Sequence, residues 1–286
     1  MIQSMTGFGK ASLQLPTKKI TIEIKSLNSK GLDLNVRMPS ALREMELGLR
    51  NRIAQKLERG KVDFSLFVEI TGEETTSKIN VPIVKSYIAQ MKDVISDADA
   101  TELMKMAVRM PDALKTERDE IDENEWAQIE TLVDEALVNI LSFRTAEGVA
   151  LEKEFIVRIG NILRLMNETL AYDEERIANV KERLRNSIAD LEVNVDENRF
   201  EQELIFYLEK LDITEEKVRL ENHLNYFLET LAGTEANGRK LGFIGQEMGR
   251  EINTMGSKSN HAQMQKLVVQ MKDELEKIKE QVLNVL

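Results

Sequence analysis

The fold is decided by residues 146–192, which read AEGVALEKEFIVRIGNILRLMNETLAYDEERIANVKERLRNSIADLE. This stretch is rich in helix-forming residues, and no proline follows Pro111 anywhere in the chain. It therefore predicts one helix of about 45 residues, roughly 70 Å long at 1.5 Å per residue. A compact domain rarely contains so long a helix. We expect it to need a partner along its length, as a helical hairpin or a coiled arm.

Helical patterns continue on both sides of this stretch. Upstream, residues 83–95 and 125–143 are predicted helices, and the polar residues 100–122 between them are interrupted by Pro111. Downstream, a second helical run spans about 199–231, in which Asp212-x-x-Glu215 is a candidate capping box for the start of a new helix. The chain is therefore predominantly helical from about residue 83 onward.

The C-terminal residues carry a regular heptad pattern. Apolar side chains step alternately by four and three residues along it, at Met264, Val268, Met271, Leu275, Ile278, Val282 and Val285. Such a seam marks a helix that packs against another helix along its whole length. Two partners remain open, because the pattern does not distinguish packing on the long helix from a contact between subunits.

The first part of the chain alternates with a period of two. Residues 20–24, 32–36 and 62–70 are predicted strands, and residues 1–15 are expected to add another strand or two. Between them a helix is predicted, with Ser40 as its N-cap. Its apolar positions are Leu42, Met45, Leu49, Ile53 and Leu57, and Gly60 ends it.

These patterns predict an α+β protein. A small, mostly antiparallel β-rich unit with one or two helices is followed by a predominantly helical C-terminal region with long antiparallel helices. We divide the chain into a basic α+β domain (1–80), a helical middle region (81–145), a long helical arm (146–195) and a helical catalytic region (196–286).

Composition limits the class of protein. The chain has 286 residues and no cysteine, which excludes disulfides, thiolate metal sites and cysteine nucleophiles and fits a reducing compartment. The start, MIQSMTGFGK, lacks the features of a signal peptide, and no apolar run approaches about 18 residues. We therefore expect a cytoplasmic protein without a membrane span.

The net charge of −11 is distributed unevenly. Residues 1–72 hold 12 Lys and Arg against 7 Asp and Glu, a net charge of +5, which leaves −16 for the remainder. A basic N-terminal part on an acidic body is compatible with phosphate contacts, although it does not require them.

Residues 236–260, ANGRKLGFIGQEMGREINTMGSKSN, hold the densest group of functional side chains. On a helix, Leu241, Ile244, Met248, Ile252 and Met255 form a core-facing stripe. Four glycines gather on one side of it, at Gly238, Gly242, Gly245 and Gly249. Because glycine destabilises a helix interior by about 1 kcal/mol, something is expected to approach this backbone closely. A neighbouring helix and a nucleic-acid backbone are both candidates.

Glu247 and Glu251 lie four residues apart, so their carboxylates share one face of that helix. A divalent cation would turn their mutual repulsion into attraction. Lys240 and Lys258 lie on the same face and would neutralise the pair in an ordinary ion-pair network instead. The residue types alone leave both possibilities open.

A second polar column precedes this segment. Asp212, Glu216, Arg219 and His223 follow one another at helical spacing. Carboxylate and neutral imidazole can bind a divalent ion that activates water, and arginine can hold phosphate oxygens. An exposed face of ion pairs would have the same pattern. The other histidine, His261, follows the helix end and is predicted to be exposed to solvent.

The standard signatures of nucleotide-binding and hydrolytic enzymes are missing from the sequence. It contains no Walker A motif, no G-x-G-x-x-G after a strand, no nucleophile elbow and no H-E-x-x-H. Small basic clusters occur in turns, at residues 28–30 with Arg37 and at 59–61. They suit phosphate contact, and ordinary solvated turns would look the same.

Several motifs together resemble the YicC/YloC family of endoribonucleases. They are SMTGFG at 4–9, EIKSLNSKGLDLNVRMP at 23–39, RGKV at 59–62, and a C-terminal block with EQEL, KLDITEEKVRLENHL, GRKLGFIGQEMGREINTMGSKSN and MKDELEKIKEQVLNVL. The similarity covers both ends, roughly two thirds of the chain, and the C-terminal signature is long and specific.

The resemblance implies a cytoplasmic bacterial enzyme that cuts RNA internally with a divalent metal, with Mn²⁺ favoured. It also implies a ring-like homo-oligomer, a hexamer, that clamps on RNA. The family pattern places functional weight on Arg199, Glu203, Lys210, Asp212, Glu216, Arg219, His223, Gly238, Arg239, Lys240, Gln246, Glu247, Arg250, Glu251, Asn253, Ser257 and Lys258.

We therefore predict a metal-dependent endoribonuclease that uses Mn²⁺ or Mg²⁺. The catalytic residues are His223, Glu247, Glu251 and Arg250. The metal ligands are His223, Glu247 and Glu251, with Asp212 or Glu203. The RNA-binding residues are Arg37, Lys61, Arg219, Arg239, Lys240 and Lys258. The alternatives are a non-catalytic RNA-binding ring, such as an adaptor or chaperone, and a helical scaffold that binds no RNA.

Overall fold

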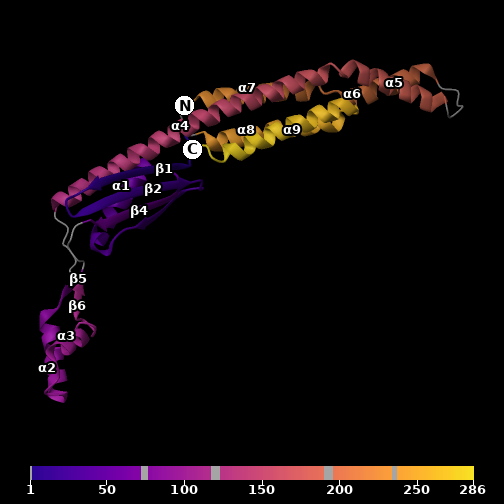
Figure 1. The fold of residues 1–286 in the computed structure, drawn as a ribbon. Helices are drawn as coiled ribbons and strands as arrows, with labels where there is room; N and C mark the ends of the chain where they lie inside the picture. Colours follow the sequence, from indigo (N-terminus) through magenta and orange to yellow (C-terminus); the bar gives the residue numbers. More distant parts are fainter. Residues whose placement is uncertain (1, 72–76, 117–122, 190–195, 234–236) are drawn as a thin grey trace.

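The molecule has three parts in Figure 1. The computed structural model describes residues 2–71, 77–116, 123–189, 196–233 and 237–286. A sheet lies near the middle, a long helical arm extends from it, and a small unit of short helices and strands lies apart from both (Figure 1). The two ends of the chain lie close together beside the sheet (Figure 1).

The sheet has four strands in the order β1-β2-β4-β3. They are β1 (Gly7–Gln14), β2 (Lys18–Leu27), β3 (Leu32–Arg37) and β4 (Gly60–Ile70). β2 pairs antiparallel with β1 and with β4, whereas β3 pairs parallel with β4. The predicted α+β class is confirmed, and the expected extra strand within residues 1–15 is β1.

The parallel pair follows from the connection between β3 and β4. Parallel neighbours need a crossover, and here it consists of the 3₁₀ helix η1 (Ser40–Met45) and α1 (Glu46–Lys56). The predicted helix therefore exists, but Ser40 is not its N-cap. Pro39 occupies the cap position with no side-chain hydrogen bond, because the chain enters a 3₁₀ turn before the α-helix begins.

One face of the sheet packs against α4 (Glu123–Leu170), which crosses β1 and β2 (Figure 1). The core between them contains buried residues of β2, β4, α1 and α4, among them Ile22, Phe64, Ile53 and Ile140. Gly9 faces α4 so closely that a Cβ there would overlap the carbonyl oxygen of Ala136. The absence of a side chain at Gly9 is thus what lets β1 lie on the helix.

The small unit consists of β5 (Ser77–Ile79), α2 (Val81–Val94), α3 (Ala100–Ala107) and β6 (Leu114–Thr116), with β5 and β6 paired antiparallel. The helix predicted at 83–95 is α2. The polar stretch 100–122, for which no helix or strand was predicted, contains α3 and β6, and its residues 117–122 lie outside the described residues. Asp99 caps α3 by accepting hydrogen bonds from Thr101 and Glu102, a local signal that the polar composition concealed.

The long helix differs from its predicted extent. α4 spans 48 residues and absorbs the helix predicted at 125–143, so it runs without a break through the proposed boundary at residue 145. It ends at Leu170, and α5 (Asp173–Ala189) begins after a turn. The end of the prediction, residues 190–192, lies outside the described residues. No proline or glycine marks this turn, so a composition argument had no signal for it.

The arm is a bundle of antiparallel helices (Figure 1). After α6 (Glu197–Leu211) come α7 (Thr214–Ala232), α8 (Gly238–Lys258) and α9 (Ala262–Val282). The helical run predicted at 199–231 is thus two helices, divided at Asp212. α7 packs on α8, α8 on α9, and α9 and α7 on α4. Within the described ranges, none of the helices is both long and apolar enough to cross a bilayer.

The heptad seam and the glycine-lined face meet inside this bundle. Every residue of the seam is buried, and α9 packs on α4 and α8. The intramolecular alternative is therefore the observed one. The glycines face α9: Cβ positions at Gly242 and Gly249 would lie 3.7 Å from Val282 and 3.4 Å from Leu275. The close neighbour of these glycines is therefore the helix α9, the first of the two expected candidates.

The chain ends join the sheet to the arm. Ser4 bridges to Val285, and the Leu286 amide donates to the Gln3 carbonyl oxygen. Beneath them Arg144 is buried, and its Nη2 donates to Ser26 Oγ at 2.5 Å and to the carbonyl oxygens of Met5 and Arg59. Burial lowers the pKa of this guanidinium. A charge held by neutral acceptors thus connects α4 to three segments.

An acid-dependent link joins α4 to α9. Glu274 accepts hydrogen bonds from Asn161 at 2.9 Å, Arg158 at 3.2 Å and Lys277 at 3.0 Å. Partial burial raises its pKa, but the bonds from Asn161, Lys277 and Arg158 outweigh this and lower the pKa to about 2. The folded-state pKa lies below the unfolded value, so the stabilisation is complete above about pH 4.5 and is lost as the pH falls toward 2.

We therefore expect Glu274→Gln to lower the free energy of unfolding by about 2 kcal/mol at neutral pH and to flatten its fall between about pH 4.5 and pH 2. Urea unfolding of both proteins across that range measures this. Glu276→Gln removes an exposed carboxylate of the same helix and should retain the wild-type pH dependence. Parallel curves for wild type and Glu274→Gln would contradict the assignment.

Candidate functional site

The predicted catalytic side chains lie on α7 and α8, which pack against each other along a line that we call the α7–α8 groove. Two side-chain contacts link these antiparallel helices: Lys240 Nζ lies 4.7 Å from the ring centroid of Tyr226, and Lys258 Nζ lies 2.7 Å from Glu216 Oε1. The mean register of the two contacts places His223 at about the height of Glu247 and Arg219 at about the height of Glu251 along the helix axes.

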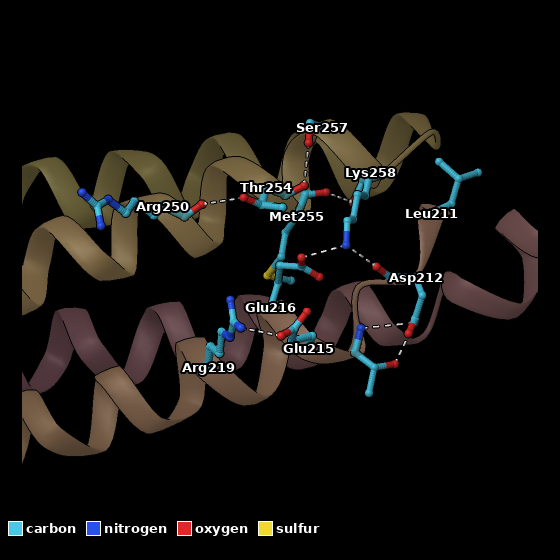
Figure 2. A network of polar contacts seen from close by, with 12 residues as sticks. Leu211, Asp212, Glu215, Glu216, Arg219, Arg250, Thr254, Met255, Ser257 and Lys258 are labelled. Atoms are coloured by element: carbon cyan, nitrogen blue, oxygen red, sulfur yellow. Dashed lines mark hydrogen bonds and ion pairs between the residues drawn. The ribbon is translucent and has the colours of Figure 1, made fainter. Parts of the chain in front are cut away.

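A network of hydrogen bonds around Lys258 connects the C-terminal end of α8 to the N-terminal end of α7 (Figure 2). Lys258 Nζ donates to Glu216 Oε1 and, at 2.9 Å, to the carbonyl oxygen of Asp212. Arg176, which is buried, donates to the carbonyl oxygens of Leu211 at 2.7 Å and Lys258 at 3.0 Å. Lys258 thus joins the end of α8 to the start of α7, and its ammonium group is engaged within the protein.

Asp212 also has a partner of its own. Its Oδ1 accepts hydrogen bonds from the Thr214 hydroxyl at 2.8 Å and the Thr214 amide at 3.2 Å (Figure 2). The hydroxyl bond is the largest cause that lowers the pKa of this carboxyl. Asp212 therefore organises the first turn of α7.

The exposed charges of the groove are paired along their own helices. Arg250 Nη1 lies 2.9 Å from Glu247 Oε1, and Arg219 pairs with Glu215. Neither Lys240 nor Lys258 neutralises Glu247, contrary to one of the two expectations for this carboxylate. Arg250 and Arg219 are largely exposed, with 73% and 58% of their side-chain surface accessible. Both guanidinium groups can therefore reach a phosphate in solvent.

Glu251 is different, because its carboxylate lies on the groove without a partner. The residue is only 9% exposed, and no hydrogen bond or ion pair among the described residues involves its side chain. Glu216 Oε2 is likewise buried without a partner. A carboxylate with little access to water is stabilised by a nearby cation. Glu216 has such a cation in Lys258, whereas Glu251 has none among the described residues.

The predicted ligands are of the chemical type that binds Mn²⁺ or Mg²⁺, but their side chains do not gather around one point in the described residues. Carboxylate oxygens and imidazole are ordinary ligands of these ions, and the half-buried His223 ring has no partner in the described part of the chain. However, no three His, Asp or Glu side chains of the described residues are grouped as a metal site. Glu203 is exposed on α6, a different helix. The structure thus places His223 on α7 and the two glutamates Glu247 and Glu251 on α8, the helix packed against it, and it does not group them around one centre among the described residues.

Two predicted RNA-binding residues line a cleft at the start of α8. It has a volume of about 550 Å³ and lies between Glu58, Arg59, Gly238, Arg239, Lys240, Phe243 and Leu286. Arg59 comes from the loop before β4, and its Nε donates to the Ser29 carbonyl oxygen at 2.8 Å. The cleft thus brings together cations from the sheet region and from the helical arm.

The sequence argument did not predict that Arg59 and Arg239 line the same cleft. It also assigned no function to Phe243. A signal for Phe243 existed, since its ring stands on the polar face of an amphipathic helix. Four predicted RNA-binding residues lie elsewhere: Arg37 and Lys61 are exposed on β3 and β4 of the sheet, and Arg219 and Lys258 are on α7 and α8. None of these four lines the cleft.

The expectation that His261 is exposed and without partners is wrong. Its ring stacks on Tyr172 with centroids 5.3 Å apart, and its Nε2 lies 3.6 Å from Glu175. Its Nδ1 accepts a long hydrogen bond of 3.5 Å from the Met264 amide and caps α9. The turn between α4 and α5, which the sequence did not reveal, supplies Tyr172.

Comparisons with known proteins agree along the whole chain. A family model described as "Endoribonuclease YicC-like, N-terminal region" matches residues 2–153, and one described as "Endoribonuclease YicC-like, C-terminal" matches residues 169–286. A protein of Clostridioides difficile (strain 630) is 32% identical over the full length of both chains, and one of Haemophilus influenzae is 28% identical, also over both full lengths. Each of these relatives is named "Probable endoribonuclease YicC".

Proposed function

The chain belongs to the YicC-like endoribonuclease family, and on this premise we propose that it cleaves RNA internally at the groove between α7 and α8. The observation that carries the proposal is Glu251, which is only 9% exposed and whose carboxylate has no hydrogen bond or ion pair among the described residues. It lies one helical turn from Glu247 and, by the mean register of the helices, at about the height of Arg219. A shielded carboxylate with no protein cation beside it favours the binding of a cation from solvent.

The ion proposed for this site is Mn²⁺ or Mg²⁺, held by His223, Glu247 and Glu251. When bound, such an ion neutralises charge on the phosphate and activates the attacking oxygen. Arg219 and Arg250 project into solvent beside the acidic pair and would orient the phosphate. The network of Lys258 and Arg176 keeps the ends of α7 and α8 together.

Two oxygen atoms are candidates for the attack on the phosphorus atom of RNA. Attack by water leaves a 5′-phosphate or a 3′-phosphate end, whereas attack by the ribose 2′-hydroxyl leaves a 2′,3′-cyclic phosphate. Both fit a groove that supplies a cation and guanidinium groups. Chemical analysis of the fragment ends distinguishes the two routes.

We extend the proposal to a ring-like homo-oligomer, a hexamer, in which several copies surround the RNA. Support comes from apolar side chains left uncovered on the arm: Val157 of α4 is 59% exposed, and Phe206 of α6 is 67% exposed. Exposed apolar residues of this size are common at contacts between subunits. Light scattering tests this part, and a monomer at micromolar concentration would contradict it.

The proposed activity is tested with purified protein and end-labelled RNA. We expect internal cuts with Mn²⁺ or Mg²⁺ and no cuts after chelation by EDTA, because the acidic pair needs the cation to approach a phosphate. Adding back the metal should restore cleavage. RNA cut equally well in EDTA would refute metal dependence.

The second candidate is a non-catalytic RNA-binding ring. It is favoured by one observation, that no three metal-binding side chains of the described residues are grouped together. In the same experiment this candidate predicts RNA that is retained, with a steep dependence of affinity on salt, and that stays intact with every divalent ion.

A further inference from the structure

Phe243 stands out among the side chains of the cleft because it is a bare aromatic ring in a charged segment. It is 61% exposed on α8, whose other face is fully buried in the bundle. Isolated exposed apolar residues are common on proteins. This ring, however, lines a cleft instead of a convex surface, where three cations, Arg59, Arg239 and Lys240, outnumber the one acidic side chain, Glu58.

The surroundings of Phe243 alternate positive charge with aromatic rings. Lys240 lies over the ring of Tyr226, which is itself 44% exposed. Arg239 and Lys240 are both exposed, and none of the ion pairs among the described residues neutralises them. Single-stranded nucleic acid is bound by this combination, with cations along the backbone and rings under the bases. A binding site for an apolar ligand or for a protein partner would need a larger continuous apolar surface than one ring supplies.

The position of Phe243 along α8 relates the cleft to the proposed active site. Glu247 follows it by four residues, which is about 6 Å along the helix axis and about 40° around it. The ring and the acidic pair therefore share one side of the helix. A base on Phe243 would place the neighbouring phosphate beside Glu247.

We propose that Phe243 is a specificity-determining residue that stacks against an unpaired base of single-stranded RNA, while Arg59, Arg239 and Lys240 hold the adjoining phosphates. The placement beside the scissile bond rests on the proposed function, whereas the stacking itself does not. A paired base is already stacked between its neighbours, so its face is covered. The contact therefore selects single-stranded segments over duplex RNA.

The experiment is a scan with abasic nucleotides in metal-free buffer, where binding is measured without cleavage. A labelled RNA of about eight nucleotides, within the range that such sites cover, is made with one base removed at each position in turn. For the wild-type protein, one position should weaken binding by about 5- to 150-fold. For Phe243→Ala that penalty should vanish, because the ring that the base contacts is gone, while Phe243→Tyr should retain it.

Phe67→Ala serves as the control, since it removes an aromatic ring that is 54% exposed on the sheet. It should leave the whole scan unchanged. A scan of Phe243→Ala that is identical to the wild-type scan would overturn the proposal, as would an equal affinity of the wild type for duplex and single-stranded RNA.

The outcomes separate this inference from the proposed function. If the abasic penalty depends on Phe243 and no metal supports cleavage, the stacking role stands and the nuclease assignment fails. If RNA is cut and Phe243→Ala shows an unchanged scan, the nuclease assignment stands and the stacking role fails. With both intact, mapping should show the cut next to the sensitive base, and a cut elsewhere would refute the placement.

Discussion

Replacing Glu247 and Glu251 together with glutamine is expected to lower the rate of RNA cleavage at least 100-fold, roughly the loss when a metal-ion contribution of several kcal/mol is removed. The substitution keeps the size of both side chains and removes both negative charges. Since the cation is held mainly by charge, the double variant should require far more Mn²⁺ or show no cleavage. Initial rates across a metal titration measure this.

RNA binding and stability should respond differently from cleavage in this variant. Loss of two carboxylates reduces repulsion of the phosphates, so affinity for RNA in EDTA should stay equal or rise. Glutamine at position 251 also removes an unpaired buried charge, so the melting temperature should hold or increase. A protein that is more stable and less active would identify Glu251 as retained for function.

The matched control is Glu276→Gln with Glu280→Gln. These glutamates have the same spacing on α9 and are both exposed, so the variant loses the same charge outside the groove. It should cut RNA as the wild type does. Unchanged turnover in the Glu247 and Glu251 variant would refute the metal assignment outright.

Local patterns predicted most of the fold because the signals were local. The strand alternation at 20–24 and 62–70 needed only a buried face, and the heptad seam from Met264 to Val285 needed only an apolar partner. The glycine-lined face also carried real information, since it marks the close approach of α9. The position at which the long helix ends was predicted incorrectly. The turn after Leu170 contains neither proline nor glycine, and tertiary packing decides it.

The site was harder to predict because its geometry is not local. Helical spacing showed that Glu247 and Glu251 share a face, but the pairing of Lys258 with Glu216 depends on the register between two helices. The cleft is a stronger example, since Arg59 and Arg239 meet only after the chain ends have joined the sheet to the arm. Motif spacing contains no such information.

The second large effect is expected at Gly9, where Gly9→Ala should lower the free energy of unfolding by about 3 kcal/mol. A Cβ at this position would overlap the Ala136 carbonyl oxygen and lie 2.8 Å from the Ile140 amide nitrogen. These are backbone atoms of α4, so no side chain can rotate away to make room. The strand would have to move off the helix and open the core. Urea unfolding followed by circular dichroism measures the loss.

Gly160 offers a matched control on the same helix, because a Cβ there meets open space. Gly160→Ala should raise stability by about 0.5–1 kcal/mol, as alanine suits a helix interior better than glycine. The opposite signs of one chemical change separate close packing from intrinsic helix preference. If Gly9→Ala were as stable as the wild type, β1 would not lie on α4 as closely as described. The packing of the sheet on α4, which positions the sheet relative to the arm, would then need a different explanation.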